Sequence, residues 1–121
     1  MNKIDEINEL ISKGVEGPYW DFKGKYCEDR KDLLKDIICM ANNLEDRDAY
    51  IIVGVKDNYD SFEVVGIENE NRMNQNELRQ LLKDAKFSSG IRPPVSLDTL
   101  EIDNKSIDVI TIINSSHTPY F

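Results

Sequence analysis

One run of residues, DAYIIVGV at positions 48–55, constrains the fold more than any other part of the chain. The run is rich in β-branched and aromatic residues and is short for a helix, so it predicts a strand. Apolar side chains would point to both faces of this strand, as they do in strands that are covered on both sides. The run therefore predicts a central strand of a buried sheet.

Three amphipathic segments predict helices around that strand. Apolar residues recur at helical spacing within residues 4–11, 33–41 and 78–85. Gly14 is expected to end the first helix, and Asp29 is placed to cap the start of the second. The third helix has the pattern of a capping box, with Asn74 followed three positions later by Glu77.

The remaining segments predict further strands and turns. The run SFEVVGI follows the turn-rich segment KDNYD, and two more strands surround a turn at residues 103–105. Pro93 and Pro94 cannot lie in a central strand, and Gly54 and Gly66 are expected to mark a bulge or close packing. The predicted order is helix, strand, helix, strand, strand, helix, strand, strand. This order predicts an α+β fold with about three helices and one mixed or antiparallel sheet.

The length and the two ends of the chain bear on its organisation. A chain of 121 residues is about one domain, with residues 1–13 as an N-terminal helix and residues 14–121 as the main unit. The chain stops at HTPYF just after a strong strand, so we expect it to be a piece of a longer protein. The first residues lack the apolar centre of a signal peptide, and no apolar run approaches the roughly 20 residues of a membrane helix. We therefore expect a cytoplasmic protein with no membrane partner.

Composition excludes several classes of function. Cys27 and Cys39 lie twelve positions apart, and with the single His117 they form neither a zinc pattern nor a disulfide framework. The sequence has no GxxxxGK[ST] motif and no glycine-rich phosphate loop, so no nucleotide cofactor is expected. The net charge of -8 weakens general attraction to a polyphosphate, so a nucleic-acid contact would need a local patch.

The segment GVEGPYWDFKGKY, residues 14–26, is chemically mixed. It carries the carboxylates Glu16 and Asp21 and two lysines, and each charge beside a strand must be solvated, paired or used. Lys23 is expected on the same side of the strand as Asp21, where it could contact a phosphate. In the simpler interpretation, Glu16 solvates a turn and Asp21 pairs with Lys23 or Lys25. In the other interpretation, the segment is part of a site.

Six segments in order carry a family resemblance that spans about residues 14–120: YWDFKGKY, KDLLKDIICMANN, YIIVGVKDN, EVVGI, IRPP and IDVITIINSSHTPY. Together they resemble the Schlafen-type AlbA domain, which often precedes a winged-helix or helix-turn-helix segment in bacteria and forms the core of animal Schlafen proteins. The resemblance implies a nucleic-acid-binding domain of a transcriptional regulator or a defence protein, with DNA or RNA as its partner. Two features depart from the family pattern. Asp21 stands where the family usually has Glu, and NLEDRD replaces a glycine pair.

The resemblance also implies a catalytic alternative. In animal Schlafens that cleave transfer and ribosomal RNA, three carboxylates form a metal-dependent site, and Glu16, Asp21 and Asp57 match their places. The alternative function is thus a divalent-metal-dependent endoribonuclease that uses Mg²⁺ or Mn²⁺, ions that prefer oxygen ligands and activate water. Without such a site, Asp57 would simply begin the KDNYD turn, where Asp is favoured.

Basic residues near the first strand and the second helix are the candidate nucleic-acid contacts, although acidic residues alternate with them. In the alternative interpretation these side chains form a salt-bridged surface. Arg79 is interpreted as helix surface that could add to a groove. A second alternative function is an assembly module without nucleic-acid contact, and a homodimer is one option for the oligomeric state. The candidate contacts are Lys23, Lys25, Arg30, Lys31 and Arg92.

Overall fold

The computed structural model describes residues 3–26, 29–42, 47–57, 61–67, 72–85 and 93–114. Within these residues, three helices and a mixed sheet form an α+β fold, as the sequence predicted. The elements in chain order are α1 (Lys3–Ser12), β1 (Trp20–Lys23), α2 (Arg30–Ala41), β2 (Ala49–Val53), β3 (Val55–Asp57), β4 (Phe62–Val64), α3 (Gln75–Asp84), β5 (Val95–Ile102) and β6 (Lys105–Ile112).

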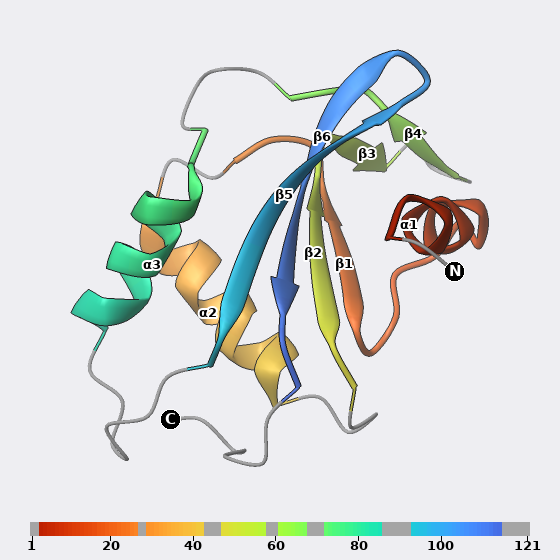
Figure 1. Cartoon of the computed structure of the whole chain (residues 1–121). Helices are drawn as coiled ribbons and strands as arrows, with labels where there is room; N and C mark the ends of the chain where they lie inside the picture. Colours follow the sequence, from red (N-terminus) through yellow and green to blue (C-terminus); the bar gives the residue numbers. More distant parts are fainter. Residues whose placement is uncertain are drawn as a thin grey trace.

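Four strands form the main sheet in the order β1-β2-β6-β5 (Figure 1). Strand β1 runs parallel to β2, whereas β2 pairs with β6, and β6 with β5, in antiparallel fashion. Every residue of β2 is buried, which confirms its predicted central position. Strands β1 and β5 form the two edges of this sheet.

A second, two-stranded sheet is formed by β3 and β4, whereas the sequence predicted a single sheet. The reason lies at Gly54, which breaks the apolar run with a φ of 107°. Its N–H donates to the Lys23 carbonyl at 2.7 Å, and a Cβ there would lie 3.1 Å from Ile107 Cγ2 and 3.2 Å from the Gly66 carbonyl carbon. The chain can change direction only at a glycine here, so β3 leaves the main sheet.

Two apolar clusters cover the two faces of the main sheet. The helix α1 and the β3–β4 hairpin lie on one face, while α2 and α3 lie on the other (Figure 1). Because successive strand residues alternate, Trp20 and Phe22 of β1 point to the α1 face. Asp21 and Lys23 therefore point to the α2 face, which sets the location of the candidate site.

The ends of the elements largely follow the sequence signals. The Asp29 side chain accepts a hydrogen bond from the Lys31 N–H, and Asn74 and Glu77 form the predicted capping box. The β5–β6 turn has only two residues, Asp103 and Asn104, with φ values of 54° and 62°. Positive φ at both positions is what a tight type I′ hairpin turn requires, so the turn is shorter than predicted. None of the described helices has the length and apolar character needed to cross a membrane.

Candidate functional site

The segment before β1 folds back along the outer edge of that strand. The Gly17 N–H donates to the Trp20 carbonyl at 3.2 Å, and the Trp20 indole N–H donates to the Val15 carbonyl at 2.8 Å. A side chain at Gly17 would collide with the Trp20 ring, which is buried in the core. Glycine at position 17 thus allows a tight fold that holds Glu16 beside β1.

This fold brings the carboxylates of Glu16 and Asp21 into hydrogen-bonding contact. The hydrogen bond to Asp21, the loss of hydration and the Asp21 charge raise the pKa of Glu16 from 4.5 to about 7, while the Phe22 N–H and Lys23 oppose the shift. Glu16 is exposed at the surface, so its contact with Asp21 is the main cause. We call these two residues the carboxylate pair.

Lys23 connects the carboxylate pair to α2. Its Nζ lies 3.3 Å from Asp21 Oδ2 and 2.6 Å from Asp36 Oδ2. Burial lowers the pKa of Lys23, but the hydrogen bond with Asp36 and the charges of Asp21 and Asp36 outweigh it, so the pKa is raised overall. The predicted Asp21–Lys23 ion pair is therefore present, and Lys23 remains charged between two carboxylates.

The third candidate ligand, Asp57, ends β3 and pairs with Phe62 in the backbone ladder. Its side chain lies outside what the structure describes, so the three-carboxylate site stays a prediction. Strand β3 begins beside the end of β1, because a Cβ on Gly24 would lie 3.8 Å from Lys56 Cβ. Among the side chains that are described, no three His, Cys, Asp or Glu groups are close enough to hold a metal ion together.

A buried carboxylate, Asp108 on β6, escaped the sequence analysis. Its Oδ1 accepts hydrogen bonds from Thr99 Oγ1 at 2.6 Å and Arg72 Nη2 at 3.2 Å, and its Oδ2 accepts from Tyr26 Oη at 2.6 Å and Arg72 Nε at 3.3 Å. Burial, followed by the hydrogen bond to Asp108, raises the pKa of Tyr26 well above its usual range. The available signal was a single charge within the apolar stretch IDVITII, because a charge in such a strand needs partners.

Comparison with models of known protein families finds a match. A family model described as "Schlafen, AlbA_2" matches residues 16–121, which include the carboxylate pair, β1 and everything that follows. The chain belongs to the Schlafen AlbA_2 family. This match confirms the resemblance carried by the six sequence segments. Membership of the family favours a nucleic-acid-binding domain, as the resemblance implied.

Solved structures with the same fold support the assignment of the architecture. The N-terminal domain of a RecG-related protein from Nitrosomonas europaea is 16% identical with a TM-score of 0.63, and the match covers 100% of this chain and 80% of that one. The DIP2311 protein from Corynebacterium diphtheriae is 17% identical with a TM-score of 0.54, and the match covers 97% of this chain and 23% of that one. At these identities the likeness shows the fold. No curated protein matches the chain.

The predicted basic contacts of this AlbA_2 domain are scattered rather than gathered in one patch. Lys25 after β1 and Lys31 in the first turn of α2 are exposed, and Arg30 is half-buried. Acidic Asp29 and Asp32 lie in the same helical turn as Lys31, so positive and negative charges alternate there as expected. Three residues named in the sequence analysis lie outside the described residues: Cys27, Arg92 and His117.

Proposed function

We propose that this AlbA_2 domain binds nucleic acid, as a module of a transcriptional regulator or a defence protein. The family match over residues 16–121 carries the proposal. The similar domain from Nitrosomonas europaea supports it, because that domain belongs to a protein described as related to the ATP-dependent DNA helicase RecG. Lys25 and Lys31 are exposed and would serve as phosphate contacts.

The net charge of -8 shapes how such binding must work. Long-range repulsion would oppose a polyphosphate, so the affinity depends on a small number of local cations. Each phosphate that a cation neutralises contributes a slope of about -0.7 to -0.9 in the dependence of log affinity on log salt. Binding should therefore weaken steeply as salt is added, although the protein as a whole is acidic.

Binding can be tested without interference from cleavage. Labelled transfer RNA, single-stranded DNA and duplex DNA would each be titrated with the protein in EDTA at several salt concentrations. We expect a shifted, intact band for at least one of them, with an affinity that falls as salt rises. No salt-dependent binding to any of the three would contradict the proposal and leave an assembly module as the better description.

A specific observation favours a second candidate, the metal-dependent endoribonuclease. The carboxylates of Glu16 and Asp21 lie in contact beside β1, and carboxylate oxygens are ligands of the kind that Mg²⁺ and Mn²⁺ prefer. Glu16 and Asp21 would hold the ion, with Asp57 as the third ligand that the family implies. When bound, such an ion would activate water and stabilise charge on a leaving oxygen. Under this proposal Lys23, whose Nζ lies 3.3 Å from Asp21 Oδ2, would contact a phosphate next to the ion.

An RNA cleavage assay distinguishes the nuclease from a domain that only binds nucleic acid. Labelled transfer RNA would be incubated with the protein in Mn²⁺ and in EDTA, with Asp21→Ala as the test variant. Asp98→Ala serves as the matched control, because Asp98 on β5 is an exposed carboxylate that forms an ion pair with Lys3 of α1. We expect cleavage only with metal, lost in Asp21→Ala and kept in Asp98→Ala. Cleavage that persists in EDTA or in Asp21→Ala would exclude the carboxylate pair as a metal-dependent centre.

A further inference from the structure

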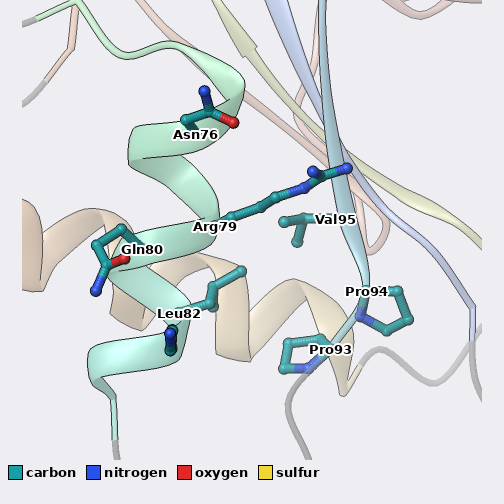
Figure 2. Close-up of a pocket in the computed structure, with 8 residues that line it drawn as sticks. Asn76, Arg79, Gln80, Leu82, Pro93, Pro94 and Val95 are labelled. Atoms are coloured by element: carbon teal, nitrogen blue, oxygen red, sulfur yellow. The ribbon is translucent and has the colours of Figure 1, made fainter.

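A groove with a volume of about 640 Å³ lies between α3 and the start of β5. In Figure 2, the Arg79 side chain reaches from α3 toward β5 and ends above Val95, while Pro93 and Pro94 form the lower part of the opposite wall. Leu82 and Val95 give the groove an apolar lining, and polar side chains of α3 stand around it. The lining residues are Asn76, Arg79, Gln80, Leu82, Lys83, Pro93, Pro94 and Val95.

The charges in this groove are of one sign. Arg79 and Lys83 both line it, and no acidic residue does so within the described part of the chain. Neither cation takes part in the ion pairs found between described residues. The nearby acids of α3 are engaged elsewhere, because Asp84 accepts from Gln80 Nε2 at 2.8 Å and Glu77 belongs to the capping box. In a protein of net charge -8, such a groove favours an anionic ligand.

Both walls of the groove are fixed to the sheet. The Gln75 side chain on α3 accepts a hydrogen bond from the Leu97 N–H at 2.5 Å and donates to the Val95 carbonyl at 3.4 Å, so it attaches the helix to the outer edge of β5. The Pro94 carbonyl accepts a hydrogen bond from the Ile113 N–H at 2.9 Å, which attaches the proline wall of the groove to the residue that follows β6. The groove is thus formed before any ligand arrives, which lowers the entropic cost of binding.

We propose that this groove binds the sugar–phosphate backbone of a single nucleic-acid strand. Arg79 and Lys83 are four residues apart on α3, or about 6 Å along the helix axis, so each can contact one of two successive phosphates. Leu82 and Val95 provide apolar surface for the sugar that links the two phosphates. Arg79 donates in a planar fork, which suits a phosphate. The identity of the ligand rests on the proposed function, but the groove is a different surface from Lys25, Lys31 and the carboxylate pair.

The lining also indicates how selective the contact is. No aromatic ring lines the groove among the described residues, so stacking on bases is not available there. Phosphate contacts position a strand without reading its sequence. The groove should therefore bind oligo(dT) and oligo(U) with similar affinity, and any preference for a base would have to arise elsewhere on the molecule.

The test uses the charge-removing double variant Arg79→Gln/Lys83→Gln. The matched control, Lys13→Gln/Lys56→Gln, removes two positive charges from the opposite side of the main sheet. Fluorescence anisotropy would follow labelled oligo(dT) and oligo(U) in EDTA across a salt series. For the groove variant we expect about tenfold weaker binding and a salt slope reduced by about 1.4, from two single-strand phosphate contacts of about 0.7 each. The control should bind as the wild type does.

Each outcome gives a clear answer. If the wild type binds and the groove variant binds equally well, the groove inference is wrong while the proposed function stands. If the wild type binds neither oligonucleotide, the groove inference is wrong, and the proposed function is then decided by the titrations with transfer RNA and duplex DNA. Equal losses in the groove variant and the control would point to general electrostatics and overturn the groove as a site. Labelled poly-glutamate would be titrated in the same way. If the groove variant lost affinity for poly-glutamate and kept its affinity for both oligonucleotides, the ligand would be an acidic protein and the inference would be wrong.

A second measurement protects the test against a variant that folds poorly. Amide resonances of the wild-type protein would be followed while oligo(dT) is added. We expect shifts at Asn76, Arg79 and Val95, which line the groove, and none in the β3–β4 hairpin. Shifts confined to Lys25, Lys31 and their neighbours would place the strand on the β1–α2 surface and overturn the inference.

Discussion

Two carboxylate centres face the same side of the main sheet and differ in how their charges are neutralised. One row across the four strands consists of Lys23, Val53, Asp108 and Thr99. Asp108 therefore lies two strands away from Lys23, which contacts the carboxylate pair. Asp108 is fully buried and accepts from two hydroxyls and an arginine. The Glu16 and Asp21 carboxylates lie in contact at the sheet edge, where this contact raises the pKa of Glu16 to about 7.

From this difference we propose a structural role for Asp108 and a functional role for the carboxylate pair. A buried carboxylate with a complete set of donors specifies the packing of the strands and loops that supply them. Two surface carboxylates in contact weaken the folded state when both are ionised, because like charges repel. Under the proposed metal-dependent function, an added cation at the pair would relieve this repulsion. The following predictions test this contrast, from the largest effect to the smallest.

Removing the buried carboxylate should have the largest effect on stability. Asp108→Ala leaves the Tyr26 and Thr99 hydroxyls and Arg72 without their common acceptor, so we expect the free energy of unfolding to fall by about 3–5 kcal/mol. Urea denaturation would measure the change. Asp98→Ala on the neighbouring edge strand removes an exposed ion pair and should change stability by less than about 1 kcal/mol. Similar values for the two variants would contradict a structural role for Asp108.

Removing one donor of the buried centre should have an intermediate effect. Tyr26→Phe deletes the hydroxyl that lies 2.6 Å from Asp108 Oδ2 and leaves the ring in the core. A hydrogen bond to a charged group contributes about 1.5–3 kcal/mol, so we expect a loss of about 2 kcal/mol in urea denaturation. An unchanged midpoint would mean that Arg72 and Thr99 satisfy Asp108 on their own.

The carboxylate pair should give a smaller effect that depends on pH. The pKa of Glu16 is about 7 in the folded protein and 4.5 in the unfolded chain, so the folded state binds this proton more tightly. Its stabilising effect is complete below about pH 4.5 and is lost as pH rises through about 7. Glu16 is exposed, so solvent screening limits the loss to about 1 kcal/mol or less.

Glu16→Gln removes this titration and serves as the test of the pH effect. We expect the variant to be as stable as the wild type near pH 4.5 and more stable at pH 8, as measured by thermal unfolding in matched buffers. Glu63→Gln, at an exposed position of β4, should keep the wild-type profile. A wild-type profile in Glu16→Gln would show that Glu16 and Asp21 do not interact in solution.

Much of the fold could be predicted because its signals are local. The apolar run of β2, the Asp29 cap and the Asn74–Glu77 capping box each depend on residues that are close in sequence, and all three are confirmed. The separate β3–β4 sheet could not be predicted, because it depends on how tightly Gly54 packs against Gly66 and Ile107. That contact joins segments that are distant in the chain.

The candidate site was predictable only in part for the same reason. The Asp21–Lys23 ion pair follows from the alternation of side chains along a strand, and it is present. Contact between Glu16 and Asp21 requires the tight fold at Gly17, and the second partner of Lys23, Asp36, comes from another element. The Asp108 centre draws on Tyr26, Arg72 and Thr99 from three separate segments, so only the isolated charge in an apolar strand could have pointed to it.

Direct binding of Mn²⁺ tests the contrast between the two centres. Isothermal titration calorimetry would compare the wild type with Glu16→Gln and Asp21→Asn, and Asp98→Asn would serve as the control for loss of an exposed carboxylate. We predict that the wild type and Asp98→Asn bind the ion, and that both variants of the pair bind it at least about tenfold more weakly. Absence of Mn²⁺ binding by the wild type, or equal binding by all four proteins, would contradict a cation site at the carboxylate pair.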